Sequence, residues 1–149
     1  MMTPRLNPFA AAPQLMQAVL DLEAQVKQCG LEHSLIELVK VRASQLNGCA
    51  YCIHMHTTDA RAAGEREERL YLLDAWREAP LYTGRERAAL GWTEALTRGA
   101  PIHARDADYA ALQAEFSAEE QVKLTVLIGM INLWNRIAIG FASVPDVGR

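Results

Sequence analysis

Apolar residues recur every three or four positions along most of the chain, a spacing that places them on one face of a helix. No stretch alternates between apolar and polar residues over a useful length, and the few β-branched residues lie within the helical patterns. Residues 1–12 are expected to form an irregular arm. The pattern predicts an all-α fold of six or seven helices, over residues 13–29, 33–46, 49–63, 65–78, 83–99, 105–115 and 118–140.

Local signals set most of the expected helix boundaries. Pro13 suits a first helical position, and Gly48 suits the left-handed position that follows a helix C-terminus. Thr83 and Ser117 are each followed three residues later by a glutamate, so each is expected to begin a capping box. The helix over 118–140 is apolar on nearly every face, which predicts a central position or an oligomer interface.

The composition is that of a globular protein. With 149 residues, 50% of them hydrophobic and 22% charged, the chain is expected to form one domain spanning residues 1–149. The net charge of −3 and the scattered basic residues argue against nucleic acid as a partner. The most apolar segment, residues 124–141, is interrupted by Asn132, Asn135 and Arg136, and a spanning helix needs ~20 consecutive apolar residues. No membrane association is therefore expected.

Cysteine usage points to a reducing compartment. The chain has three cysteines, which are too few for a disulfide scaffold, and an odd number leaves one of them unpaired. Prolines near the N-terminus interrupt any apolar run of the signal-peptide kind. We therefore expect a cytoplasmic protein, in which a Cys-x-x-Cys motif is more often catalytic or metal-binding than structural.

The strongest candidate for chemistry is a cluster of two cysteines and two histidines within eight residues, Cys49 to His56. A helix start favours the thiolate form of a cysteine, and both Cys49 and Cys52 fall at such a start after the Gly48 break. Their spacing of three places both sulfurs on one face, within reach of a disulfide. His56 lies one turn beyond Cys52 and can take the thiol proton, whereas His54 points elsewhere.

Glu37 is the candidate for a third group beside the histidine. The helices on either side of Gly48 form a hairpin, with Glu37 eleven residues before this glycine and His56 eight residues after it. At ~1.5 Å rise per residue the two lie ~16 and ~12 Å from the turn, a gap that one glutamate side chain can bridge. The expected relay runs from Glu37 through His56 to Cys52. Glu37 also follows Ser34 by three residues, so membership of a capping box is the alternative.

The same cluster allows two other kinds of site. The two cysteines and His56, together with Glu37 or His54, have the donor atoms of a zinc site. Structural zinc sites usually take their ligands from two separated pairs, and this sequence has no second pair, so no metal is expected. Covalent haem attachment requires Cys-x-x-Cys-His, and Ile53 occupies the histidine position.

The stretch from Glu37 to His56 resembles the core of the alkylhydroperoxidase D family, a branch of the carboxymuconolactone decarboxylase superfamily. The family pattern is a glutamate, a cysteine twelve residues later, a second cysteine after three more and a histidine after another four. Glu37, Cys49, Cys52 and His56 match all four positions. Residues 131–139 also look like the final helix of that family.

The resemblance implies an AhpD-like helical subunit that assembles into trimers or hexamers and works without a metal or organic cofactor. By position, a hydroperoxide would oxidise Cys52 to a sulfenic acid, and Cys49 would resolve it as a disulfide. Glu37 and His56 would carry protons, and an outside dithiol, either a lipoyl group or a thiol protein, would reduce the disulfide. Some members carry a histidine between the two cysteines, where this chain has alanine and tyrosine, so any relay through that histidine is absent.

These observations predict a thiol-dependent hydroperoxide reductase with a dithiol–disulfide cycle. A lactone decarboxylase-like enzyme in the same pocket is one alternative, although superfamily members with that activity lack the cysteine pair. The other alternative is a redox-sensing module, in which the disulfide changes binding instead of reducing peroxide.

Overall fold

The computed structural model describes residues 2–99 and 102–148, with the backbone alone for 102–104. All regular secondary structure in these residues is helical, so the predicted all-α class is confirmed. The elements are α1 (Pro8–Ala11), α2 (Pro13–Lys27), α3 (His33–Asn47), α4 (Ala50–Ala62), α5 (Glu67–Tyr71), the 3₁₀ helix η1 (Leu73–Ala75), α6 (Gly84–Arg98), α7 (Ile102–Glu115) and α8 (Ala118–Gly140).

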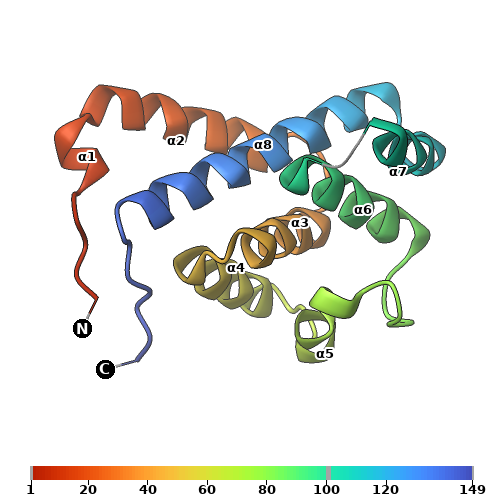
Figure 1. The fold of residues 1–149 in the computed structure, drawn as a ribbon, viewed down its shortest axis with the longest axis horizontal. Coiled ribbons are helices and arrows are strands. Elements are labelled where there is room, and N and C mark those ends of the chain that lie inside the picture. Colours follow the sequence, from red (N-terminus) through yellow and green to blue (C-terminus); the bar gives the residue numbers. More distant parts are fainter. Residues whose placement is uncertain (1, 100–101, 149) are drawn as a thin grey trace.

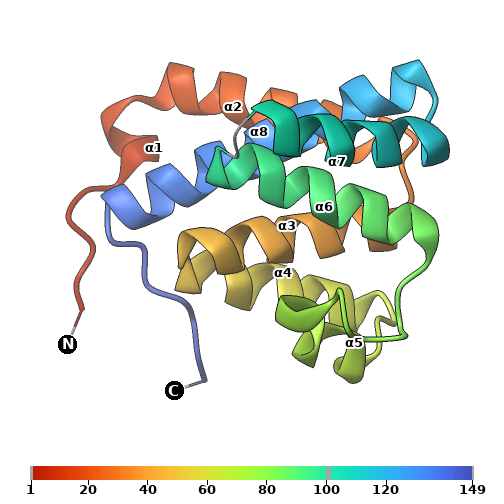
Figure 2. The same ribbon diagram turned by 45° about the vertical axis from the view of Figure 1, so that its right-hand side comes forward.

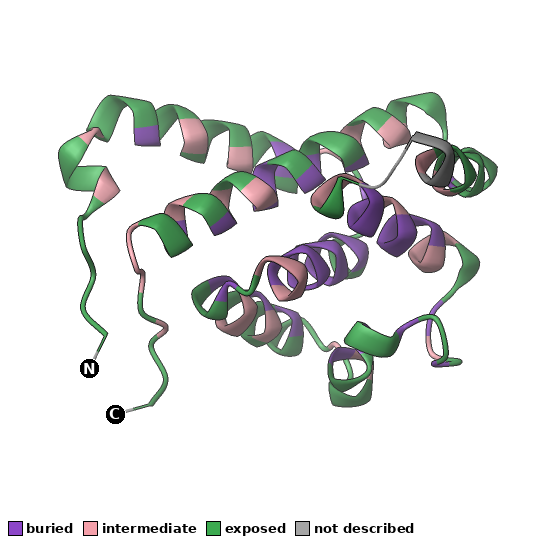
Figure 3. Ribbon diagram, in the orientation of Figure 1, coloured by how far each residue is buried: buried purple, intermediate pink, exposed green. Residues whose placement is uncertain are grey.

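Helix α3 is the centre around which the other helices pack. It contacts α4, α6 and α8, and Figures 1 and 2 show these three helices on different sides of it. Ten consecutive residues of α3, from Leu35 to Ser44, are buried, so the helix is almost continuously purple in Figure 3. A helix buried on every side must satisfy its polar side chains internally, and this requirement shapes the site described below.

Two apolar clusters lie on opposite sides of α3. Leu35, Ile36 and Val39 pack with residues of α2, α6, α7 and α8, whereas Leu38 and Val41 pack with residues of α4, α5, η1 and α6. Each fully buried aliphatic side chain of this kind contributes about 1.5–3 kcal/mol relative to an exposed one. The apolar residues of one helix therefore hold both halves of the structure together.

The sequence signals at helix ends act as predicted. Helix α2 begins at Pro13, and Gly48 follows α3 in the left-handed conformation with φ of 68°. The capping boxes at Thr83 and Ser117 are both formed, at the starts of α6 and α8. These local motifs determine where α2, α6 and α8 begin and where α3 ends.

Two regions differ from the expected elements. The expected irregular arm contains the short helix α1, because the Asn7 side chain accepts hydrogen bonds from two backbone N–H groups of its first turn. The helix expected over 65–78 is divided into α5 and η1. Leu70, Leu73 and Trp76 are buried, and their spacing of three suits the tighter 3₁₀ turn better than a continuous α-helix.

Helix α8 does not take the central position that was one of the two expectations for it, and an oligomer interface, the other, stays a prediction. Seven of its 23 residues are buried, and apolar side chains such as Val122 and Leu133 are exposed, so α3 occupies the centre instead. Among the described residues α8 is the one helix whose length and hydropathy would suffice to cross a membrane, a test that the core helix of a globular protein also passes. The chain ends meet beside it, where Arg5 donates hydrogen bonds to the carbonyls of Gly140 and Phe141.

Candidate redox site

The two cysteines occupy the turn between α3 and α4. The N–H of Cys49 donates to the carbonyl of Ser44 at 3.0 Å, and Cys49 is the N-cap of α4, where its sulfur accepts from the N–H of Cys52 at 3.3 Å. The two side chains form a disulfide, with the Cα atoms 5.4 Å apart. Both residues are 1% exposed and pack against Ala138 of α8. The spacing therefore brings the sulfurs together, as predicted.

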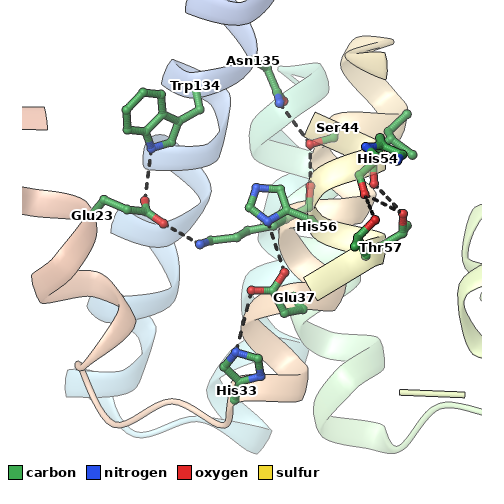
Figure 4. A network of polar contacts seen from close by, with 12 residues as sticks. Glu23, His33, Glu37, Ser44, His54, His56, Thr57, Trp134 and Asn135 are labelled. Atoms are coloured by element: carbon green, nitrogen blue, oxygen red, sulfur yellow. Dashed lines mark hydrogen bonds and ion pairs between the residues drawn. The ribbon is translucent and has the colours of Figure 1, made fainter. Parts of the chain in front are cut away.

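The buried His56 side chain lies one turn beyond Cys52 and meets Glu37 across the hairpin. Its Nδ1 is 3.1 Å from Oε2 of Glu37, and both side chains are buried (Figure 4). The expected Glu37–His56 contact is therefore confirmed. The alternative capping box at Ser34 does not form, because α3 begins after Glu32 and has no side-chain cap.

The electrostatics of the pair favour an ionised carboxylate. Burial alone would raise the pKa of Glu37, but the hydrogen bond from His56 and the positive charges of His56, Lys40 and His33 hold it below its usual value. An ionised carboxylate only accepts hydrogen bonds, so Nδ1 of His56 must be the donor. The other ring nitrogen, Nε2, is then free to accept a proton when the ring is neutral.

A cavity of about 510 Å³ lies beside the cysteine pair and is walled mainly by apolar residues. Cys52 and His56 contribute to its wall, whereas Cys49 does not. Of the two cysteines, Cys52 is therefore the one that borders the cavity. The other lining residues are Pro4, Leu6, Asn7, Pro8, Phe9, Leu20, Glu23, Lys27, Tyr51, Met55, Asp59, Trp134, Ile137, Ala138, Ser143 and Val144.

Several residues of this wall were not predicted from the sequence. Tyr51 and Met55 are each 37% exposed and line the cavity. Glu23 and Trp134 come from α2 and α8 and are joined by a hydrogen bond of 3.2 Å from the indole Nε1. No short-range sequence motif indicates them, because they reach the site only through the packing of helices that are far apart in the sequence.

A buried lysine links this wall to α3. Lys40 is 1% exposed, and its Nζ lies 2.5 Å from Oε1 of Glu23. Burying a lone ammonium group is very costly, so Glu23 supplies the compensating charge. The sequence carries one clue to this pair, a lysine flanked by valines within the apolar pattern of α3.

A cluster of asparagines fixes the cysteine turn to α8. Nδ2 of Asn47, the last residue of α3, donates to Oδ1 of Asn132 at 2.9 Å and of Asn135 at 2.8 Å. Nδ2 of Asn135 also donates to the Ser44 hydroxyl at 3.0 Å. These bonds explain why polar residues interrupt the apolar sequence of α8, and they hold the turn that carries the cysteines.

One group of side chains in the described residues is close enough to share a cation. Ligand atoms of Glu37, His56 and Asp59 lie within 4.8 Å of one another, and Asp59 is exposed. We do not assign a metal site here, because the Glu37 carboxylate is already engaged by His56. The expected zinc alternative would have used the cysteines, which instead bond to each other.

Comparison with known proteins identifies the family. The model of the carboxymuconolactone decarboxylase family matches residues 13–95, a range that holds Glu37, both cysteines and His56. The chain belongs to the carboxymuconolactone decarboxylase family. The matched range runs from α2 into α6, so it contains the whole α3–α4 hairpin.

Two relatives resemble nearly the whole chain. The uncharacterized protein YdfG of Bacillus subtilis is 39% identical, over 95% of this chain and 97% of its own length. A crystal structure of a protein of unknown function from Agrobacterium tumefaciens, suggested to be the antioxidant defence protein AhpD, is 48% identical. That comparison has a TM-score of 0.94 and covers 98% of this chain and 100% of the other, which confirms the AhpD-like fold.

The same fold extends to more distant proteins. An uncharacterized peroxidase-related protein from Silicibacter has a TM-score of 0.80 at 23% identity, over 93% of this chain and 74% of its own. At that identity the likeness concerns the arrangement of the helices alone.

Proposed function

We propose that this protein is a thiol-dependent hydroperoxide reductase with a Cys49–Cys52 dithiol–disulfide cycle. The observation that carries the proposal is the position of Cys52, in the cavity wall beside the His56–Glu37 pair and bonded to Cys49. A peroxide reductase needs an accessible sulfur, a base for its proton and a second sulfur for the oxidised product. All three lie within one helical hairpin.

The cycle begins at Cys52. Its proton passes to Nε2 of His56, and the thiolate attacks the hydroperoxide, so that an S–O bond forms, the O–O bond breaks and the alcohol leaves with a proton from His56. The Cys49 thiol then attacks the sulfenic acid, which forms the disulfide and releases water. An outside dithiol, a lipoyl group or a thiol protein, reduces the disulfide and is itself oxidised.

Glu37 has a supporting role in this cycle. Its carboxylate holds the Nδ1 proton of His56, which keeps the imidazole turned so that Nε2 is available to the thiol. The suggested antioxidant role of the Agrobacterium relative supports the same kind of chemistry. A continuing supply of dithiol suits a reducing compartment such as the cytoplasm, which remains our proposal for its location.

A thiol count tests the proposal directly. One equivalent of an organic hydroperoxide should lower the three free thiols of the reduced protein to one, because Cys29 stands apart from the pair. Cys49→Ser and Cys52→Ser should each abolish multiple turnover with a dithiol, and mass spectrometry should locate the bond. Cys29→Ser is the matched control and should keep full turnover.

Other outcomes would support the alternatives. Full turnover in either single variant of the pair would contradict the two-cysteine cycle. Lactone turnover that survives thiol alkylation would instead favour decarboxylase-like chemistry, a candidate that the family membership keeps open. Oxidation that stops after one equivalent despite excess dithiol would favour a redox sensor.

A further inference from the structure

Glu37 faces a second cavity, separate from the one beside Cys52. This second cavity also measures about 510 Å³, and its wall comes from the start of α3, the end of α4, the segment leading into α5 and the start of α6. Glu37 lines this second cavity, whereas His56 and Cys52 line the first. The hydrogen bond between Glu37 and His56 therefore joins two cavities on different sides of the α3–α4 hairpin.

A second imidazole stands on the far side of Glu37. His33 is the first residue of α3, its side chain is 65% exposed, and it lines the second cavity. Its Nε2 lies 4.0 Å from Oε1 of Glu37, whereas Oε2 faces Nδ1 of His56 (Figure 4). One carboxylate thus lies between a buried imidazole and an exposed one, with a different oxygen toward each.

We propose that His33 and Glu37 extend the proton path of His56 to solvent, on the side away from the substrate cavity. The proposal rests on the proposed function, because it gives a route for the proton that Cys52 must lose. An exposed histidine suits this task, since its ring is in contact with solvent and can swing by the ångström that separates 4.0 Å from a hydrogen bond.

The proton balance is complete in both directions. When Cys52 ionises, its proton moves to Nε2 of His56, the Nδ1 proton moves to Oε2 of Glu37, and the carboxyl group turns and passes it to His33 and then to solvent. When the peroxide bond breaks, the alkoxide takes the Nε2 proton while a proton returns to Nδ1 along the same path. The cycle ends with the ring in its starting tautomer.

Two features of the structure favour this route over the cavity beside Cys52. The first cavity has a mainly apolar wall, which offers few hydrogen-bond partners to a file of water, and in the proposed reaction it must also hold the substrate. The second has a charged wall, in which Glu65, Arg66, Arg69 and Glu86 lie beside His33 and Glu37. Arg69 is paired with both Glu65 and Glu86, which leaves His33 as the titratable group that faces the free oxygen of Glu37.

The test measures thiol ionisation without any peroxide. Reduced protein is taken through a rapid rise in pH in dilute buffer, and thiolate formation is followed by its ultraviolet absorbance. His33→Gln should slow this step by about 10-fold, less than the ~10²–10⁴ typical of a lost proton-transfer group because leakage through the first cavity remains. Added imidazole should restore the rate. His54→Gln is the matched control, since His54 has no contact with Glu37.

The outcomes separate this inference from the proposed function. An unchanged rate in His33→Gln, or a slower rate that imidazole does not restore, would overturn the proton path even if the protein reduces hydroperoxides. Circular dichroism confirms that the variant is folded, and its KM for hydroperoxide should equal that of the wild type. Absence of hydroperoxide turnover in the wild type would instead refute the proposed function while leaving the ionisation experiment interpretable.

Discussion

The proposed chemistry depends on the Glu37–His56 pair, which is joined by one hydrogen bond of 3.1 Å. Its carboxylate is ionised and buried, which fixes the tautomer of the imidazole before any substrate arrives. A preset tautomer matters because a base must present its free nitrogen to the thiol at the moment of transfer.

Glu37→Gln tests this role at the scale of one residue. The amide keeps the shape and a hydrogen bond but loses the charge, so His56 no longer has an anion to hold its Nδ1 proton. We expect kcat for hydroperoxide to fall by roughly 10²–10⁴ with little change in KM. His56→Asn should lower kcat by a similar factor. The double variant should have a kcat no lower than that of either single variant, because the two residues act as a unit. Additive losses would contradict the relay.

The contact between Glu37 and His56 could be predicted from the sequence, but the cavity wall around it could not. Glu37, Cys49, Cys52 and His56 share one hairpin, so helix geometry alone brought Glu37 to the right depth. Glu23 and Trp134 lie on α2 and α8, far away in sequence, and the cavity wall they share with Cys52 depends on how those helices pack. The exposure of Tyr51 and Met55 depends in the same way on the cavity beside them.

At the scale of elements, the α3–α4 hairpin depends on its glycine. Gly48 has φ of 68° with nothing within 4 Å of an added Cβ, so the cost of a side chain there comes from the backbone alone. Gly48→Ala should therefore lower the free energy of unfolding by about 1–2 kcal/mol. It should also reduce hydroperoxide turnover, because the turn carries both cysteines.

Gly129→Ala provides the matched control for this prediction. Gly129 lies inside α8, again with nothing within 4 Å of an added Cβ, and its φ is ordinary. Alanine there should raise the free energy of unfolding by about 0.4–1 kcal/mol, because it restricts the unfolded chain. Denaturant unfolding of the two variants measures both changes, and equal effects at the two sites would show that the conformation of Gly48 is not under constraint.

Elements with strong end signals were the ones that the sequence predicted well. The capping boxes at Thr83 and Ser117 placed the starts of α6 and α8 to the residue. The segment 65–78 has apolar residues but no capping box, and it is divided into α5 and η1, of which η1 contacts α3. Helix α8 was judged from its composition, which does not distinguish a central helix from one with an exposed apolar side.

Across the whole molecule, buried carboxylates make stability depend on pH. Oε1 of Glu94 accepts hydrogen bonds of 2.9 Å from Arg42 and from Trp76, and its other oxygen accepts from Arg77. Burial alone would raise the pKa of Glu94, but these donors hold it below its usual value of 4.5. Folding therefore lowers the proton affinity of this carboxyl, so its stabilising effect is present above about pH 4.5 and is lost as the pH falls further.

Glu94→Gln tests this contribution. At neutral pH it should cost about 1–3 kcal/mol, because it weakens charge-assisted hydrogen bonds to the buried Arg42, which keeps Asp74 as its other carboxylate partner. The difference in the free energy of unfolding between wild type and variant should narrow toward about pH 3. There the wild-type carboxyl becomes protonated and loses its charge, whereas the variant has no carboxyl to protonate. Glu67→Gln, at an exposed ion pair with Arg61, should change stability by no more than about 1 kcal/mol. A constant difference across pH would contradict the titration.

The two chain ends have a practical consequence for anyone handling the protein. Pro4, residues 6–9 and residues 143–144 form part of the wall of the cavity beside Cys52, and Arg5 ties the N-terminal segment to the end of α8. An affinity tag fused at either terminus would extend a segment that lines this cavity, which we propose as the hydroperoxide site. Kinetic constants should accordingly be compared before and after proteolytic removal of the tag.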